Sequence, residues 1–254
     1  MRSTDGSAGD VNYERIGRAY SSYRQPDVRI AGLIAAALAD ATTVLNVGAG
    51  TGSYEPDRVV TAVEPSASMR AQRHPDVPAI DAMAEDLPFD DDSFDAAMST
   101  FSVHQWHDLA AGLREVRRVT RGPVVILTCD PLRVRDFWLY EYAREVLDTE
   151  ARRYPSIQSL ADGLGGTIST AIVPIPFDCT DGFNEAYYGR PEKLLESDAR
   201  LSCSAWSFVD EPGQQRFAEH LQRDLHDGTW DRRYGHLRNT PTLSGSLVLV
   251  TASR

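Results

Sequence analysis

The sequence predicts a doubly wound α/β fold, with a mostly parallel sheet of seven strands and a helical insertion before the last strand. Two observations lead to this fold class. The apolar residues 43–47 run directly into three glycines at alternate positions, Gly48, Gly50 and Gly52. After them, strand-like and helix-like segments alternate as far as residue 129, and such alternation is typical of parallel sheets built from β-α-β units.

The first half of the chain accounts for most of the expected sheet. Residues 1–11 are rich in Gly, Ser and Asp, so we expect a disordered tail. Apolar residues at helical spacing predict a helix over residues 30–38, and Asp108 is placed to cap a second helix that runs to Val119. Strands are expected at residues 43–47, 58–63, 77–80, 94–99 and 123–129, with a short helix around 66–72.

The second half of the chain has a different pattern. Apolar and aromatic residues at helical spacing predict a helix over residues 139–147. Residues 168–177 are expected to form a sixth strand, and its two prolines place it at an edge of the sheet. Residues 181–240 contain short helical segments that we interpret as an insertion or cap, before a last strand at 246–251. The length fits one domain over residues 12–254.

Composition limits the expected partners. The chain has 254 residues, and 26 Lys and Arg against 37 Asp and Glu give a net charge of −11. A field of this sign repels phosphate backbones and anionic headgroups, so neither nucleic acid nor a membrane surface is expected as a partner. The cysteines lie far apart and suit a reducing interior, and no apolar signal segment opens the sequence. We therefore expect a cytoplasmic monomer or homodimer.

The glycine turn after the first strand predicts a nucleotide-type cofactor site. Glycine adopts positive φ and lets a ligand approach the backbone, whose amides point outward after the strand ends. A dinucleotide site prefers G-x-G-x-x-G, whereas the spacing here is G-x-G-x-G and position 53 is Ser. Glu64, at the end of the second strand, suits the two ribose hydroxyls of a nucleoside in either case. A nicotinamide-dependent dehydrogenase therefore stays an alternative on these residues alone.

Four later motifs decide between these cofactors. They are residues 84–89 (AEDLPF), 92–97 (DSFDAA), 104–108 (HQWHD) and 113–119 (LREVRRV). Together with the glycine turn, this part of the chain resembles the class I S-adenosylmethionine-dependent methyltransferases, in particular the small-molecule branch akin to the ubiquinone-biosynthesis methyltransferases. The resemblance covers roughly the first half of the chain. It implies a Rossmann-like fold, S-adenosylmethionine as cofactor and S-adenosylhomocysteine as product.

The resemblance also implies which residues contact the cofactor. Residues 12–30 would form a lid over it, and two positions depart from the family pattern: Asn46 and Met83 stand where many members have an acidic residue. The implied cofactor-binding residues are Asn46, Gly48, Ala49, Gly50, Gly52, Glu64, Pro65, Met69, Met83, Ala84, Glu85, Thr100 and Tyr20.

The expected acceptor side depends on histidine and aromatic residues. His104 follows the fourth strand, at the edge where open α/β sheets bind ligands, and is our candidate general base; the alternative is a packed histidine. His104 and His107 have no third ligand in range, so no metal is expected. The expected substrate-binding residues, for which ordinary packing is the alternative, are Tyr13, Tyr23, His104, Trp106, Trp138 and Tyr187.

These interpretations lead to one predicted function and one alternative. The predicted function is methyl transfer from S-adenosylmethionine to an O, N or C nucleophile of a small molecule, aromatic and prenyl-like metabolites being candidates. The cap, residues 181–240, would carry the substrate specificity. The alternative is a catalytically silent S-adenosylmethionine-binding protein that serves as a regulatory or scaffold subunit.

Overall fold

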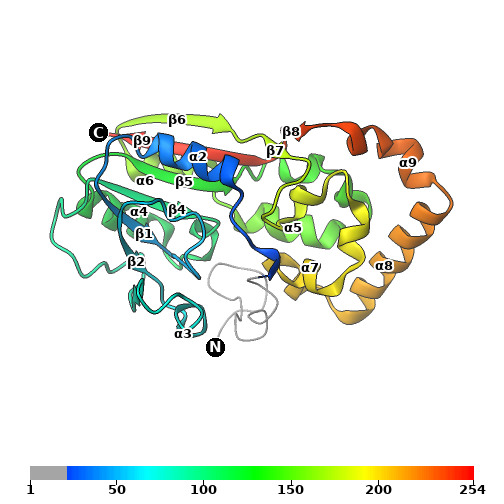
Figure 1. The fold of residues 1–254 in the computed structure, drawn as a ribbon, viewed down its shortest axis with the longest axis horizontal. Helices are drawn as coiled ribbons and strands as arrows, with labels where there is room; N and C mark the ends of the chain where they lie inside the picture. Colours follow the sequence, from blue (N-terminus) through cyan, green and yellow to red (C-terminus); the bar gives the residue numbers. More distant parts are fainter. Residues whose placement is uncertain (1–21) are drawn as a thin grey trace.

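A computed structural model describes residues 22–254. Within these residues, one sheet of seven strands has the order β3-β2-β1-β4-β5-β9-β6 (Figure 1). Strand β9 is antiparallel to both of its neighbours, and the other strand pairs are parallel. The strands are β1 Thr43–Val47, β2 Val59–Val63, β3 Ala79–Ile80, β4 Ala96–Thr100, β5 Val124–Cys129, β6 Thr167–Ile172 and β9 Leu247–Ser253. The predicted fold class is confirmed.

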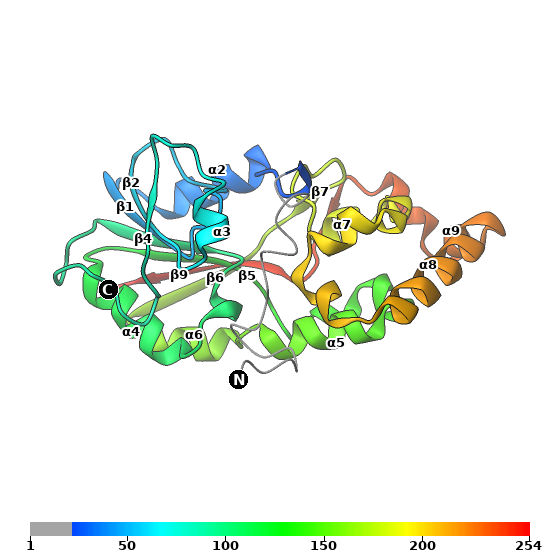
Figure 2. The same ribbon diagram turned by 90° about the horizontal axis from the view of Figure 1, so that it is seen from below.

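Helices cover both faces of this sheet, as Figure 2 shows. Helix α2 (Val28–Ala37) packs its buried Ile30 and Ile34 into the apolar cluster on one face. Helices α4 (Leu109–Val119) and α6 (Ile157–Leu164) pack into the cluster on the other face. The Asp108 carboxylate accepts a hydrogen bond from the Ala111 amide at 2.9 Å, which confirms the predicted cap of α4.

A group of helices lies beyond one end of the sheet in both views (Figures 1 and 2). We call residues 134–153 and 184–239 the helical region. Its elements are the 3-10 helices η2 Val134–Asp136, η3 Trp138–Glu141, η4 Asn184–Tyr187, η5 Pro191–Leu195, η6 Ser204–Phe208 and η7 Gly235–Asn239, and the α-helices α5 Arg144–Arg153, α7 Ser197–Leu201, α8 Glu211–His226 and α9 Thr229–Tyr234. Its interior is aromatic and includes the fully buried Trp206 and Trp230.

Several predicted boundaries are wrong, for identifiable reasons. The helix expected over 139–147 is divided, because Ala143 leaves helical geometry with φ −138° and α5 begins after it. The strand expected over 168–177 ends at Ile172, since Pro174 has no amide hydrogen to continue the ladder. The residues after it form β7 (Ile175–Pro176), which pairs with β8 (Thr242–Leu243) in a separate small sheet. The helix expected around 66–72 is shorter, α3 (Ala67–Arg70).

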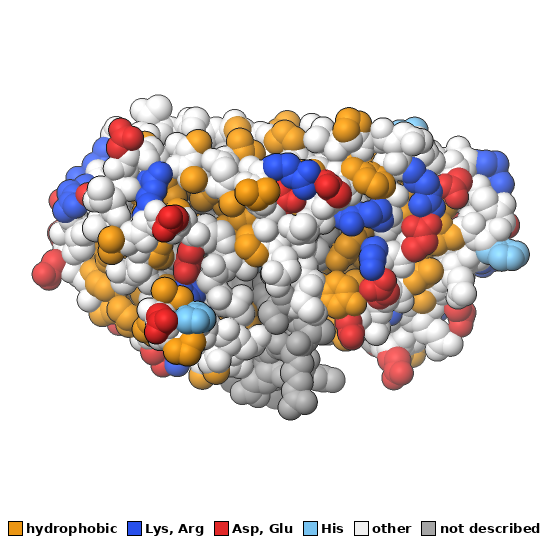
Figure 3. All heavy atoms as spheres, in the orientation of Figure 1, with side chains coloured by type: hydrophobic (Ala, Val, Ile, Leu, Met, Phe, Trp, Pro, Cys, Tyr) orange, Lys and Arg blue, Asp and Glu red, His pale blue; other side chains and the backbone are white. Residues whose placement is uncertain are grey.

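The surface carries both signs of charge. On the face drawn in Figure 3, Arg and Lys side chains lie among Asp and Glu side chains rather than in one basic field. Ion pairs such as Arg118 with Asp91 and Arg238 with Glu192 account for part of this mixture. Among residues 22–254, no helix combines the length and the apolar character needed to cross a bilayer.

Candidate functional site

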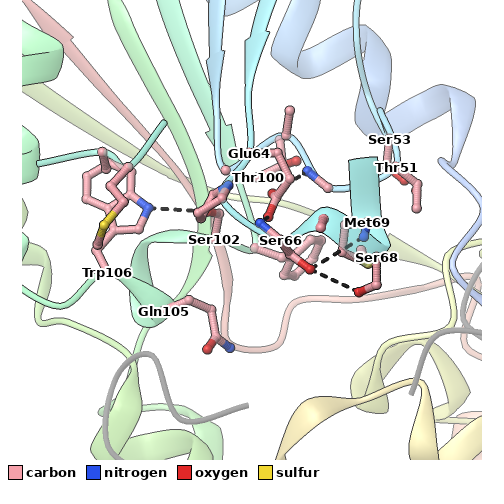
Figure 4. Close-up of a pocket in the computed structure, with 18 of the residues that line it drawn as sticks. Thr51, Ser53, Glu64, Ser66, Ser68, Met69, Thr100, Ser102, Gln105 and Trp106 are labelled. Atoms are coloured by element: carbon pink, nitrogen blue, oxygen red, sulfur yellow. Dashed lines mark hydrogen bonds between the residues drawn. The ribbon is translucent and has the colours of Figure 1, made fainter. Parts of the chain in front are cut away.

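A pocket of about 480 Å³ opens at the carboxyl ends of β1, β2 and β4 (Figure 4). Its size is in the usual range for a small-molecule site. Eleven of the predicted site residues line it: Gly48, Ala49, Gly50, Glu64, Pro65, Met69, Met83, Ala84, Glu85, Thr100 and Trp106. Further residues that were not predicted also line the pocket: Arg24, Thr51, Ser53, Tyr54, Ser66, Ala67, Ser68, Phe101, Ser102, Gln105 and His107.

The loop of residues 48–54, which with Glu64 we call the cradle, has a left-handed backbone at its glycines. The φ angles are +68° at Gly48, +53° at Gly50 and +97° at Gly52. The amides of Gly48 and Ala49 both donate to the Val63 carbonyl at 3.0 Å, which ties the loop to the end of β2. A Cβ added at Gly48 would lie 1.7 Å from the Ser102 Oγ atom. The loop therefore needs glycine here for both conformation and space.

The Glu64 carboxylate joins the two sides of the cradle. Its Oε2 accepts from the Gly50 amide and its Oε1 from the Ser66 amide, both at 2.8 Å (Figure 4). Burial raises the pKa of Glu64, whereas these two amides act in the opposite direction. Each carboxylate oxygen keeps a further lone pair, so Glu64 can also accept hydrogen bonds from two ligand hydroxyls. This geometry fits a ribose diol.

Two of the predicted cofactor residues do not reach the pocket surface. Asn46 is fully buried behind the loop, where its Nδ2 donates to Glu55 Oε1 at 3.0 Å. Glu55 is in turn paired with Arg73 at 2.9 Å, and that guanidinium lies close to Gly52. Asn46 and Gly52 therefore lie in the layer that supports the cradle. The sequence pattern missed this because the pair of Glu55 and Arg73 belongs to no motif.

A buried junction connects the cradle to the chain before α2 and to the segment before η4. The Tyr54 hydroxyl donates to Asp181 Oδ2 at 2.9 Å, and Arg24 Nε donates to Asp181 Oδ1 at 2.5 Å. Burial, followed by the Asp181 charge, raises the pKa of Tyr54. Tyr54 also has a positive φ of 65°, which is unusual for a non-glycine residue. Spacing along the chain gave no signal for these contacts.

His104 is buried rather than exposed in the pocket. Its ring packs edge-on against Tyr154, with 4.7 Å between centroids, and its Nδ1 has no hydrogen-bond partner among the described residues. Burial, then the charges of Arg153 and Arg24, holds the pKa of His104 well below its usual value. The imidazole is therefore neutral near pH 7, and its protonated form is disfavoured. This placement favours the packed-histidine alternative.

The other predicted acceptor residues have varied positions. Trp106 lines the pocket, and its Nε1 donates to Ser102 Oγ at 3.2 Å (Figure 4). Tyr23 is half-buried and donates to Glu196 at 3.0 Å. Trp138 and Tyr187 lie in the packed core of the helical region, outside the pocket. Tyr13 and Tyr20 lie outside the described residues. Over residues 22–254, His, Cys, Asp and Glu side chains form no group of three suited to a metal ion.

Comparisons with known proteins identify a family and similar folds. Residues 45–126 match the methyltransferase domain family. A solved structure described as a putative methyltransferase from an antibiotic biosynthesis pathway of Anabaena variabilis is 29% identical, with a TM-score of 0.85, over 92% of this chain and 100% of that one. The family match over residues 45–126 includes the cradle, β4 and the loop after it.

Two further relatives show how far the likeness extends. The demethylmenaquinone methyltransferase of Corynebacterium kroppenstedtii is 34% identical over 93 residues, which are 34% of this chain and 41% of that protein. The aligned part of this chain covers less than half the length of the curated relatives that it matches first: 29% of one and 41% of the other. The [4+2]-cyclase SpnF shares the fold, with a TM-score of 0.53 and 17% identity over 89% of this chain and 80% of that one.

Proposed function

This chain carries a class I S-adenosylmethionine-dependent methyltransferase domain, and from that premise we propose that it transfers a methyl group from S-adenosylmethionine to a small-molecule acceptor. S-adenosylhomocysteine is the product. The observation that carries the proposal is the cradle: a left-handed glycine loop and a buried carboxylate meet at one pocket, inside the segment that matches the family.

The pocket residues suit the parts of this cofactor. Glu64 would accept from the ribose hydroxyls, and the backbone of Gly48 and Gly50 would leave room for the methionine part. The Met83 to Glu85 segment and Met69, which line the same pocket, would border the adenine. When bound, the cofactor supplies a methyl group on a positively charged sulfur, which is already activated toward nucleophiles. The remaining task of the protein is to orient the acceptor and to manage its proton.

The acceptor we propose is a small apolar molecule with an aromatic or prenyl-like part. Phe101 and Trp106 give the pocket an aromatic side at the carboxyl end of β4. The relatives named demethylmenaquinone methyltransferases support this class of acceptor. We also propose that residues 12–30 and the cap, residues 181–240, cover the acceptor; the contact of Arg24 with Asp181 supports this.

The assembly and location that we propose rest on charge and composition. A net charge of −11 opposes binding to nucleic acid or to anionic membranes. We infer a cytoplasmic protein that works as a monomer or homodimer. Size-exclusion chromatography with light scattering tests the oligomeric state, and a larger assembly contradicts it.

The experiment that tests the function has two parts. Calorimetric titration should show tight binding of S-adenosylhomocysteine and no comparable binding of NAD. A single-turnover assay with labelled S-adenosylmethionine should then transfer the label to a small aromatic acceptor. Tight NAD binding alone contradicts the proposal. Binding of S-adenosylhomocysteine without transfer to any small molecule supports the silent regulatory subunit instead.

A further inference from the structure

The last turn of α5 packs against the loop that follows β4. Glu150, Arg153 and Tyr154 are three and four residues apart, so they share one helical face. Arg153 donates to Gln105 Oε1 at 2.7 Å, and Tyr154 packs on His104 with 4.7 Å between ring centroids. Gln105 itself lines the pocket. This helical face therefore lies directly behind one side of the pocket.

A second segment meets the same place from the helical region. Phe183 packs against Phe101, which lines the pocket, with 5.4 Å between ring centroids. The neighbouring Asn184 donates through Nδ2 to Glu150 Oε1 at 2.8 Å. Its Oδ1 accepts from the Trp206 indole at 3.0 Å, which fixes the amide so that its NH₂ group faces Glu150. We call residues 101–105, 150–154 and 183–184 the acceptor wall.

Two glutamates approach each other here, but they are held differently. The Glu185 carboxylate accepts from the Ser246 amide at 2.9 and 3.0 Å and from the Ser246 hydroxyl at 2.9 Å, so it has a structural task at the start of β9. Glu150 is half-buried and is held by the side chain of Asn184, not by the backbone. Among the described residues, one Glu150 oxygen accepts from Asn184 and no hydrogen bond is made to the other, which leaves that oxygen able to accept from a ligand.

The charges around Glu150 bring its titration close to neutrality. Burial, followed by the negative charge of Glu185, raises its pKa to about 7, while Asn184, Arg153 and Arg24 act in the opposite direction. The thiols of Cys129 and Cys203 and the Tyr154 hydroxyl also face this carboxylate, and burial raises the pKa of each, so they stay neutral. A group that titrates near the working pH is the most efficient general base.

His104 is the weaker candidate for the same task. Its protonated form is disfavoured by burial and by the two arginines, and its ring packs edge-on against Tyr154. Its unpartnered, buried Nδ1 nevertheless shows that the acceptor wall holds a polar group that the described residues do not satisfy. The wall thus has a second feature of a ligand site, independent of Glu150.

We propose that Glu150 takes the proton from the methyl acceptor, and that this acceptor is a small aromatic molecule bearing a hydroxyl or ammonium group. The inference rests on the proposed methyltransferase function. The acceptor's O–H or N–H bond breaks and its proton moves to a Glu150 oxygen. The freed electron pair forms the bond to the methyl carbon, and the carbon–sulfur pair returns to sulfur. Glu150 releases the proton to solvent afterwards. Phe101, Phe183 and Tyr154 supply the aromatic contacts.

The test compares Glu150→Gln with Glu145→Gln. Gln keeps the size of residue 150 and still accepts from Asn184, but it cannot take a proton. Glu145 is an exposed carboxylate on the same helix and serves as the matched control. Three probes differ in their protons: 4-methylphenol and phenethylamine, which is an ammonium ion near pH 7, must each lose a proton before attack, whereas the tertiary aromatic amine N,N-dimethylaniline has a free lone pair at that pH.

Three measurements separate the outcomes. Binding of S-adenosylhomocysteine should be within about twofold in both variants, and its absence in the wild type overturns the proposed function itself. NMR of protein labelled with ¹³C at the glutamate carboxyls should show one group titrating near pH 7 that disappears only in Glu150→Gln. Single-turnover transfer to phenol or phenethylamine should fall about 100-fold in Glu150→Gln alone, with transfer to the tertiary amine unchanged.

Other results overturn the inference while leaving the function intact. Equal transfer by wild type and Glu150→Gln does so, as does normal S-adenosylhomocysteine binding with no transfer to any of the three probes. A loss in His104→Gln but not in Glu150→Gln assigns the proton to His104 instead. If Glu150→Gln does not fold, the wild-type pH–rate profile decides. Transfer to the phenol should decline below about pH 7, and a flat profile contradicts the role of Glu150.

Discussion

The cradle lines the pocket directly and the acceptor wall reaches it through residues 101–105, and the two regions are built in opposite ways. The cradle consists of backbone groups and one carboxylate, and the hydrogen bond from Gly50 to Glu64 spans only 14 positions of the chain. The acceptor wall consists of side chains that contact each other across longer separations, 34 positions between Glu150 and Asn184 and 48 between Gln105 and Arg153.

This difference has a physical consequence. A site made of backbone groups is sensitive to any added Cβ atom, while most of its side chains can change without effect. A site made of paired side chains is sensitive to the chemistry of each partner, because a lost partner leaves a polar group desolvated and unsatisfied. The two regions should therefore fail under different substitutions, in the following order of effect.

Gly48→Ala should have the largest effect and tests the backbone character of the cradle. The new Cβ would lie 1.7 Å from Ser102 Oγ at a residue with φ +68°, so affinity for S-adenosylhomocysteine should fall by at least about 100-fold. Calorimetry measures this. Gly32→Ala is the control, since its Cβ meets nothing within 4 Å in helix α2, and it should be stabilising by about 0.5–1 kcal/mol. Unchanged affinity in Gly48→Ala places the cofactor elsewhere.

Asp181→Asn tests the junction that joins the cradle to the helical region. Asp181 is 2% exposed and accepts from both Arg24 and Tyr54, so removing its charge should destabilise the fold by about 3 kcal/mol. Urea unfolding measures the change. Asp178→Asn is the matched control on the same segment: its carboxylate is 77% exposed and pairs with Arg29, so no measurable change is expected. Equal effects show that the buried junction has no special role.

Glu64→Gln should have an intermediate effect, limited to the cofactor. The carboxylate accepts from the amides of Gly50 and Ser66, and an amide in its place presents a donor to one of them. We expect affinity for S-adenosylhomocysteine to fall about 30-fold, in keeping with the loss of one charged hydrogen bond. Asp81→Asn is the control, because Asp81 is exposed, pairs with Arg70 and lies outside the pocket. If both variants bind alike, Glu64 does not hold the ribose.

The pH dependence of stability should show the smallest effect and concerns the acceptor wall. Burial raises the pKa of Glu150 from 4.5 to about 7, so between these values the folded protein holds a proton that the unfolded chain lacks. The stabilisation from this proton is complete below about pH 4.5 and is lost as pH rises through about 7. The melting temperature of the wild type should therefore fall by a few degrees relative to Glu150→Gln as pH rises from about 5 to about 8. Parallel curves show that Glu150 titrates normally.

Much of the fold was predictable because its signals are local. The strand predicted over residues 43–47 is β1 with the same bounds, and Asp108 caps α4 as expected. Glu64 could be placed at the pocket because the carboxyl ends of parallel strands meet at one edge of a sheet. The helix expected over 139–147 failed because the dihedral angles of Ala143, which no pattern marks, interrupt it.

The acceptor wall could not be predicted because the side-chain contacts that assemble it join residues far apart in the chain. Helix α6 and the pair of β7 with β8 were also missed, and α6 and β7 lie in the connection between the wall segments 150–154 and 183–184. The predictions for Trp138 and Tyr187 rested on residue type alone, and aromatic residues serve a core as well as a pocket. Their burial in the helical region follows from packing that sequence spacing does not encode.

The sequence by itself determined the fold class, the cofactor side of the site and the family resemblance. Those features depend on glycines, alternating apolar segments and strand ends, whose positions follow from short-range spacing. Only the tertiary structure decided which titratable groups reach the acceptor side. It buried His104 against Tyr154 and brought Asn184 to Glu150. The reason is physical: a pKa and a hydrogen-bond partner depend on distance and burial in space, and residues far apart in the chain set both.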